Sequence, residues 1–143
     1  MNVSNLLATK GHEVATISQE RTVSDALTIL KEHGIGALVV TGATSPLVGI
    51  FSERDVVRAL ATSGADALTF TVSELMTSPV ATCSEETSVT ELMGTMTERR
   101  VRHVPVVSDG RLVGMVSIGD VVKARFDELE HDKQELLDYV SAR

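Results

Sequence analysis

The sequence is short of several residues on which small proteins often depend. Aromatic residues make up 3% of the 143 positions and tryptophan is absent, so the core has to be built from aliphatic side chains and methionine. Cys83 is the only cysteine, which excludes an intramolecular disulfide and a zinc site made of several cysteines. The longest apolar runs, such as 37–40, have the length of a strand, so we expect no membrane span.

Positive charge is also scarce. The chain carries 13 basic and 20 acidic side chains, a formal net charge of −7, which disfavours nucleic acid and anionic membranes as partners. One basic patch stands out at residues 99–103, where Arg99 and Arg100 follow a helix and are interpreted as solvated residues at its end. Residues 1–8 lack the charged segment and long apolar run of a secretory signal, so we expect a cytoplasmic protein.

The clearest feature that the sequence does contain is an internal repeat. Residues 14–41 align with residues 80–107, and residues 47–59 align with residues 112–124 beyond a loop that is one residue shorter. Identical residues occur in the same order throughout both aligned stretches, and chance does not produce such a series. The chain is therefore expected to contain two copies of one supersecondary unit.

Each copy has the pattern of a β-α-β-β-α unit. The first helix of each copy has apolar residues at i, i+3, i+4 and i+7, and a capping-box pattern precedes it at 22–25 and at 88–91. Gly34 is the expected stop of this helix in the first copy. The second helix is expected to begin at Ser52 or Ser117. The expected strands are 14–17, 35–40 and 47–51 in the first copy and 80–83, 101–107 and 112–116 in the second.

These elements predict an α/β fold made of two pseudo-symmetric halves. One unit has too little apolar surface to be stable alone, so the two copies should pack through their sheets. We assign residues 1–66 to the first repeat, with its core at 14–60, and residues 67–124 to the second, with its core at 80–124. Residues 125–143 should extend the last helix and pack on their own domain or on a second subunit. The apolar residues of this extension are Phe126, Leu129, Leu136, Leu137 and Val140.

The motif Gly-x-x-Ser-x-x-Asp occurs once in each copy, at 49–55 and at 114–120, where a strand runs into a helix. A helix N-terminus offers backbone N–H groups and a positive dipole end to a phosphate, and an aspartate accepts from both hydroxyls of a ribose. We expect the glycine to let a ligand approach the strand backbone. Ser-x-x-Asp is also a capping box, so the pattern by itself is compatible with a purely structural role.

Together with residues 102–107, these motifs make the chain resemble a CBS-domain pair, or Bateman module, of the small stand-alone bacterial and organellar type. The resemblance covers nearly the whole chain. It implies two halves whose sheets meet and leave two clefts, which in that family bind AMP, ADP, ATP or another adenosyl ligand such as NAD or S-adenosylmethionine. It also implies a homodimer that forms through helices.

The resemblance implies a role for each motif position. The aspartate would hold the ribose hydroxyls, the serine would reach phosphate, the end of each first strand would border the base, and basic residues on the strand at 102–103 would contact phosphate. The ligand-binding residues implied in this way are Thr16, Ile17, Gly36, Ala37, Ser52, Arg54, Asp55, Thr82, Cys83, Arg102, His103, Pro105, Ser117 and Asp120. Because aromatic rings are scarce, aliphatic side chains have to sandwich the base. Those expected to do so are Ile17, Ile50, Val80 and Met115.

The two copies differ at positions that matter for this interpretation. Residues 36–37 are Gly-Ala where residues 102–103 are Arg-His, and Gly119 stands where the first copy has Arg54. The basic side chains that could contact a ligand therefore stand at different positions in the two copies. We expect the two clefts to differ in affinity or in ligand.

The sequence favours a regulatory module over an enzyme. It contains no recognisable nucleophile–base pair, P-loop or metal-ligand cluster, and Cys83 is interpreted as a small hydrophobic residue. We therefore expect no catalytic cofactor and no metal. Bound AMP, ATP or NAD would be a regulatory ligand, and the chain would act on an unidentified protein in trans. Two alternatives stay open: a homodimeric scaffold that binds no ligand, and an enzyme that acts on nucleotides.

Overall fold

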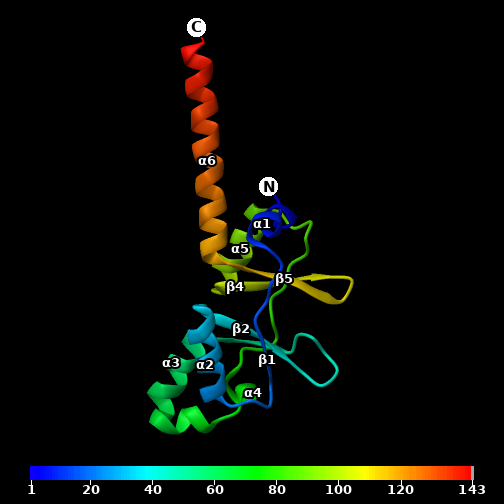
Figure 1. Ribbon diagram of the computed structural model, residues 1–143, viewed down its shortest axis with the longest axis vertical. Helices are drawn as coiled ribbons and strands as arrows, with labels where there is room; N and C mark the ends of the chain where they lie inside the picture. Colours follow the sequence, from blue (N-terminus) through cyan, green and yellow to red (C-terminus); the bar gives the residue numbers. More distant parts are fainter. Residues whose placement is uncertain (143) are drawn as a thin grey trace.

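Two small sheets, one from each repeat, lie one above the other in the molecule, and a long helix rises away from them (Figure 1). This computed structural model describes residues 1–142 and confirms the mixed α/β fold. The helices are α1 (Val3–Lys10), α2 (Val23–His33), α3 (Glu53–Ser63), α4 (Val72–Leu75), α5 (Val89–Arg99) and α6 (Ile118–Ser141), with a 3-10 helix, η1, at Gly64–Thr69. The strands are β1 (Thr16–Ser18), β2 (Ala37–Thr41), β3 (Gly49–Ser52), β4 (His103–Ser108) and β5 (Arg111–Ser117).

The first repeat forms a three-stranded sheet, in which β1 is parallel to β2 and β2 is antiparallel to β3. Helix α2 begins where the capping pattern predicts, because the Thr22 hydroxyl accepts from the Asp25 N–H at 3.1 Å. It ends at Gly34, which has the left-handed conformation at φ 61°. Ser88 begins α5 in the same way as Thr22 begins α2. The local signals at the helix ends therefore place α2 and α5 correctly.

The second repeat has a two-stranded sheet, because its expected first strand is reduced to a single bridge. In the first repeat the Val39 N–H donates to Ala15 O at 3.1 Å and extends the pairing of β1 with β2. The residue aligned with Val39 is Pro105, which has no N–H to donate. Cys83 keeps two backbone bonds to β4, at 3.0 and 2.9 Å, and is the one residue of 80–83 that pairs with it. The expectation of a full strand at 80–83 is wrong for this reason.

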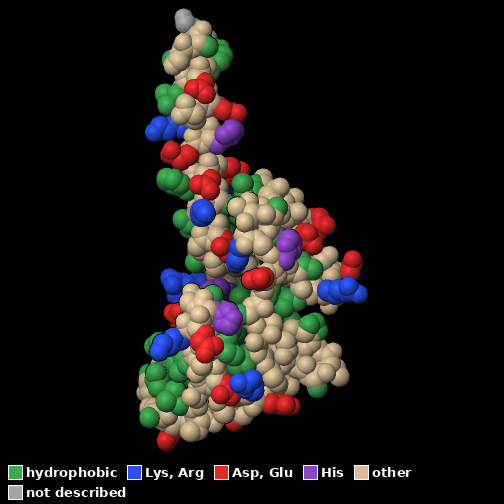
Figure 2. Space-filling view, viewed as in Figure 1, with side chains coloured by type: hydrophobic (Ala, Val, Ile, Leu, Met, Phe, Trp, Pro, Cys, Tyr) green, Lys and Arg blue, Asp and Glu red, His purple; other side chains and the backbone are tan. Residues whose placement is uncertain are grey.

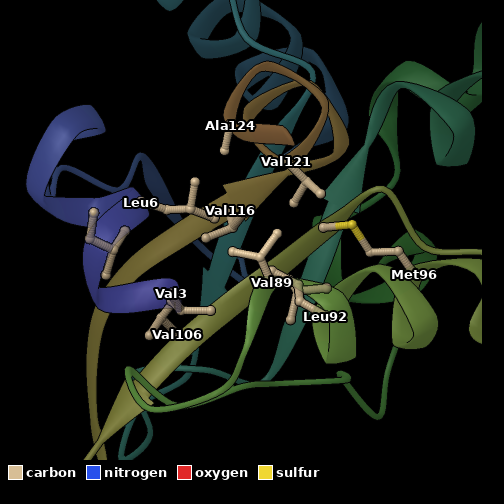
Figure 3. Packing of buried hydrophobic residues seen from close by; sticks show 11 residues of the cluster. Val3, Leu6, Val89, Leu92, Met96, Val106, Val116, Val121 and Ala124 are labelled. Carbon is tan, nitrogen blue, oxygen red and sulfur yellow. The ribbon is translucent and has the colours of Figure 1, made fainter. Parts of the chain in front are cut away.

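The helical segment that precedes each repeat packs on the other repeat. Figure 3 shows Val3 and Leu6 of α1 lying among side chains of α5, β4, β5 and α6, which all belong to the second repeat. In the same way Val72 of α4 is buried in the core of the first repeat. We call residues 3–13, which include α1, and residues 72–79, which include α4, the exchanged segments. They tie the two halves together in addition to the contact between the sheets.

The exchanged segments account for the glycine of each Gly-x-x-Ser-x-x-Asp motif. A Cβ atom on Gly49 would lie 2.5 Å from Met76 Sδ, and a Cβ atom on Gly114 would lie 2.8 Å from a methyl carbon of Leu7. Side chains of the exchanged segments therefore fill the space beside both glycines. The expectation that these glycines admit a ligand is wrong, because what they admit is a packed side chain of the other half.

The two sheets meet through a small apolar cluster. Ala37, Val39 and Ile50 of the first sheet are buried there, with Leu112 and Met115 of β5 packed against them. This contact confirms that the two copies pack through their sheets, as the repeat predicts. Each repeat also has a larger core of its own on the opposite side of its sheet.

Helix α6 continues from the second repeat into the tail as one element of 24 residues. Val121 and Ala124 anchor its start in the core of the second repeat, whereas every residue from Leu129 to Ala142 is exposed (Figure 1). The helical extension expected from residue 125 is confirmed up to Ser141, and Arg143 lies outside the described residues. Over residues 1–142, no helix combines the length and the apolar character needed to cross a membrane.

Candidate functional site

Two clefts contain the two Ser-x-x-Asp motifs. Cleft 1, of about 330 Å³, includes the start of α3, and cleft 2, of about 790 Å³, includes the start of α6. Both volumes lie in the usual range of small-molecule sites, about 300–1,000 Å³. Of the residues predicted from the sequence, cleft 1 brings together Gly36, Ser52, Arg54, Asp55, Arg102 and His103, and cleft 2 brings together Gly36, Ala37, His103, Ser117 and Asp120.

In cleft 1 the Asp55 carboxylate is held by groups of its own chain. It is 6% exposed and accepts from the Ser52 N–H at 2.8 Å, the Ser52 hydroxyl at 3.2 Å and the Thr77 hydroxyl at 3.1 Å. These bonds replace the water that burial removes from the carboxylate. A carboxylate has about four acceptor positions, so the three bonds leave capacity for a ligand hydroxyl. Asp55 therefore caps α3 and still has acceptor capacity for a ligand.

Positive charge is concentrated around cleft 1, where five arginines stand against two carboxylates. The arginines are Arg54, Arg58, Arg99, Arg100 and Arg102, and the carboxylates are those of Glu53 and Asp55. Within residues 1–142, none of the five guanidinium groups forms an ion pair with a carboxylate. Uncompensated positive charge at a cleft of an otherwise acidic chain attracts an anion. Guanidinium groups match the oxygens of phosphate in geometry as well as in charge.

Arg100 has a backbone conformation that few residues other than glycine adopt. It follows α5 at φ 55° and ψ 43°, whereas the aligned residue of the first repeat is Gly34, at φ 61°. A residue with a Cβ atom is less stable there than glycine by roughly 1 kcal/mol. The second repeat bears this strain at a position whose side chain lines cleft 1. Arg100 is therefore a strong candidate for contact with a ligand.

In cleft 2 the aspartate has a charged partner instead of a hydroxyl. Lys10 Nζ, at the end of α1, donates to the Asp120 carboxylate and to Met115 O, and the Ser117 N–H donates to Asp120 at 2.8 Å. Burial acts to raise the pKa of Asp120, but the hydrogen bonds from Lys10 and Ser117, with the charge of Lys10, outweigh it and lower that pKa. A ligand hydroxyl at Asp120 has to share the carboxylate with Lys10 or displace it.

His103 lines both clefts. Burial lowers the pKa of His103, the charge of Lys10 lowers it further, and the carboxylates of Asp120 and Glu53 oppose this only in part. The ring is therefore neutral near pH 7 and offers a hydrogen bond rather than a positive charge. Gly36 also lines both clefts, and a Cβ atom there would lie 3.1 Å from a carboxylate oxygen of Glu53. These residues form the part of the wall that the clefts share.

Some predicted ligand residues lie away from both clefts in the described part of the chain. Those that line neither cleft are Thr16, Ile17, Thr82, Cys83 and Pro105. Ile17 is buried in the core of the first repeat and Pro105 is buried in β4. The residues that line the clefts are instead 14–15 and 80–81, two positions earlier in each copy. Of the aliphatic residues expected to flank a base, Ile50 and Val80 line cleft 1 and Met115 lines cleft 2.

The single cysteine is a poor nucleophile. Burial raises the pKa of Cys83 to about 11, with a further contribution from the charge of Glu91. The thiol is therefore protonated at physiological pH, in agreement with its interpretation as a small hydrophobic residue. Residues 1–142 also contain no group of three or more His, Cys, Asp or Glu side chains placed to hold a metal ion.

Five residues of the clefts that matter for the charge and the aspartates were missed from the sequence. Arg99 and Arg100, interpreted there as solvated residues at a helix end, line cleft 1. Lys10 and Thr77 reach the two aspartates only because the exchanged segments cross to the opposite repeat, and no local pattern reports that crossing. Arg58 had a usable signal, because it follows Arg54 by four residues on α3 and therefore lies on the same helix face.

The fold and the clefts define a tandem pair of α/β repeats with one candidate ligand site at each second helix. A model of the CBS domain matches residues 3–62 and 72–127, and the chain belongs to the CBS domain family. The solved structure of a CBS-domain containing protein from Agrobacterium tumefaciens is 47% identical, with a TM-score of 0.84 over 87% of this chain and 92% of that chain. The mitochondrial CBS domain-containing protein CBSX3 of Arabidopsis thaliana is 36% identical over 146 residues, 96% of this chain and 71% of the relative.

A further solved structure is the CBS domain pair of the protein MJ0100, in complex with 5′-methylthioadenosine and S-adenosyl-L-methionine. It is 28% identical to this chain, with a TM-score of 0.79 over 90% of this chain and 98% of that chain. The resemblance inferred from the motifs is thus confirmed as family membership.

Proposed function

We propose that the protein is a regulatory module that binds an adenine nucleotide in the clefts and passes the signal to another protein. The observation that carries this proposal is that both Ser-x-x-Asp helix starts lie in a cleft beside residues of the opposite half. Each start combines a carboxylate for ribose hydroxyls with a helix N-terminus that favours phosphate. The adenosyl ligands in the related MJ0100 pair support this ligand class.

Cleft 1 is the proposed site for a phosphorylated ligand such as AMP, ATP or NAD. The ribose hydroxyls donate to Asp55, and the aliphatic side chains of Ile50 and Val80 flank the adenine. The phosphates lie toward the five arginines, whose charge exceeds that of the neighbouring carboxylates. Arg100 makes its contact from a strained backbone conformation, which fits a residue retained for binding rather than for stability.

Cleft 2 is proposed to bind more weakly or to prefer a ligand with less negative charge. Its lining has one lysine, Lys10, against the carboxylates of Glu13 and Asp120. This balance disfavours a triphosphate, because the local charge does not compensate it. A ligand that reaches Asp120 also loses part of the ion pair with Lys10. The difference in affinity or ligand that the sequence predicts for the two clefts is thus attributed to the different surroundings of Asp55 and Asp120.

The regulatory step follows from the position of the clefts between the two halves. A nucleotide in cleft 1 contacts residues of both repeats and favours the arrangement that fits it best, by an amount set by its differential affinity. We propose that a separate protein recognises this arrangement in trans, that the module is a homodimer, and that it acts in the cytoplasm. The bound nucleotide is a regulatory ligand in this proposal, and no catalytic cofactor takes part.

Isothermal titration calorimetry with AMP, ATP, NADH and S-adenosylmethionine tests the proposal. We expect at least one of them to bind well below millimolar concentration, with two unequal events where both clefts fill. Asp55→Asn should remove the event of cleft 1 and leave that of cleft 2, whereas Asp120→Asn should do the reverse. The two variants serve as controls for each other, because each alters one copy of the same motif. Absence of binding by all four ligands would refute nucleotide sensing.

A scaffold that binds no ligand is the second candidate function. It is favoured by one observation: both aspartates already have hydrogen-bond partners within the chain, so the motifs have a structural role. This candidate predicts the same melting temperature with every nucleotide. A ligand at a hundred times its Kd would add about 2.7 kcal/mol to the free energy of unfolding. Hydrolysis of bound ATP that Ser117→Ala abolishes would favour an enzyme instead.

A further inference from the structure

The projecting part of α6 carries an apolar row that the chain itself does not cover. Figure 1 shows this part of the helix extending beyond both repeats, and Figure 2 shows hydrophobic side chains on its surface among acidic ones. The row consists of five large apolar residues that are between 60% and 64% exposed: Val122, Phe126, Leu129, Leu136 and Val140. Exposure of this kind along a fully formed helix marks an interaction surface.

The spacing of this row is that of a coiled coil. Steps of four and three residues alternate from Val122 through Phe126, Leu129, Lys133, Leu136 and Val140, which fills every a and d position of the heptad repeat. Five of these six positions are apolar. An α-helix drifts by about 20° per heptad from such a row, so over fewer than three heptads the row stays on one face. The opposite face of the helix start is the one buried in the second repeat, by Val121 and Ala124.

We propose that α6 pairs with α6 of a second copy of this chain as a short parallel coiled coil. A two-fold dimer needs one surface that complements itself, and the charges beside the row meet this condition. In the parallel register Arg125, at position g, faces Glu130, at position e, of the second copy, and this attraction occurs twice. Arg125 also bonds Glu128 of its own helix at 3.0 Å, but such a partly exposed pair within one helix is weak and exchanges readily.

The core position at Lys133 is also consistent with a parallel pair. In that register each Lys133 packs beside Asp132 of the second copy, because the g residue borders the space that an a residue enters. A single lysine at an a position specifies register and number of strands at a cost in stability. Lys133→Leu should therefore tighten the association.

The antiparallel arrangement is disfavoured by the same charges. The antiparallel register that aligns all six core positions places Glu130 opposite Glu130 of the second copy and Asp132 opposite Asp132. Both pairs repel, whereas the parallel register has attraction at the corresponding places. The sequence of α6 therefore selects orientation as well as partner.

This inference specifies the homodimer proposed above and does not depend on nucleotide binding. The test is the mass of the whole protein in solution, by sedimentation velocity over a concentration series. We expect a mass of two chains for the unaltered protein and of one chain for Leu129→Glu with Leu136→Glu. Both leucines are exposed on the single chain, so the variant keeps its fold, which circular dichroism verifies.

The matched control is Gln134→Glu with Ser141→Glu, which adds the same charge at two b positions outside the row. The control should stay dimeric. A single-chain mass for the unaltered protein at every concentration would refute the inference. A dimer that survives Leu129→Glu with Leu136→Glu would leave the homodimer proposal standing and refute the coiled coil.

Disulfide trapping tests the orientation. In a Cys83→Ser background, Val140→Cys places the two introduced thiols side by side in a parallel pair, whereas in an antiparallel pair each faces Val122. We expect covalent dimers on oxidation for Val140→Cys and far fewer for Ser141→Cys, which points away from the row. An intact dimer in which Val140→Cys gives no more covalent product than Ser141→Cys would refute the parallel arrangement.

Discussion

Arg100 follows α5 in the left-handed conformation and lines cleft 1, so replacing it by glycine separates the backbone strain from the ligand contact. Arg100→Gly relieves strain of roughly 1 kcal/mol. Part of this gain is offset, because glycine gives the unfolded chain more freedom, by about 0.5 kcal/mol. We therefore expect the free energy of unfolding to rise by about 0.5 kcal/mol. The same variant removes one exposed phosphate contact of about 1 kcal/mol, which raises the Kd for ATP about fivefold.

Urea denaturation without nucleotide measures the first effect, and calorimetry with ATP and with adenosine measures the second. Adenosine has no phosphate, so its affinity should not change. Arg100→Ala is the matched control: it removes the same contact but keeps a Cβ atom, so ATP binding should fall without the gain in stability. A less stable Arg100→Gly protein would contradict the account of the strain. Unchanged ATP binding in both variants would contradict the role of Arg100 in cleft 1.

Three further predictions concern other parts of the molecule. Lys10→Met should lower the free energy of unfolding by about 1 kcal/mol near pH 7. Because the folded-state pKa of Asp120 is lowered, urea denaturation should show this difference begin to shrink as the pH falls below about 4 and disappear once the pH is below the folded-state pKa. Gly49→Ala should destabilise the protein by about 1–3 kcal/mol, because its Cβ atom would lie 2.5 Å from a sulfur atom. Gly94→Ala, in open space on α5, should instead stabilise the protein by up to about 1 kcal/mol, and thermal melts compare the two variants. Cys83, with a pKa of about 11, should resist iodoacetamide at pH 8 in the folded protein and react after unfolding, and fast labelling of the native protein would contradict the raised pKa of this thiol.

The features that the sequence predicted well are those set by local chemistry. The caps of α2, α5 and α6 at Thr22, Ser88 and Ser117 follow from a side-chain oxygen three residues before an N–H group. Helix α3 begins at Ser52 as predicted, with the Ser52 N–H donating to the Asp55 carboxylate. The alignment of the copies likewise predicts the two halves and their contact, because each copy has an apolar face that it cannot bury alone.

The features that escaped prediction depend on contacts between distant segments. The exchange of α1 and α4 between the repeats leaves no periodic signal, so the partners of the two aspartates, Thr77 and Lys10, were not foreseen. The role of Gly49 escapes prediction for the same reason, since the side chain beside it comes from an exchanged segment. The shortened strand at 80–83, in contrast, follows from a single residue, Pro105, and was readable from the alignment.

The central claim is that the Ser-x-x-Asp helix starts hold the ribose of an adenine nucleotide in the clefts between the repeats. A crystal structure of the protein grown with saturating ATP tests it most directly. We expect ATP in cleft 1, with its ribose hydroxyls on the Asp55 carboxylate, its adenine between Ile50 and Val80, and its phosphates beside Arg100 and the neighbouring arginines. A nucleotide bound away from both aspartates, or clefts that stay without nucleotide at saturating ATP, would contradict it.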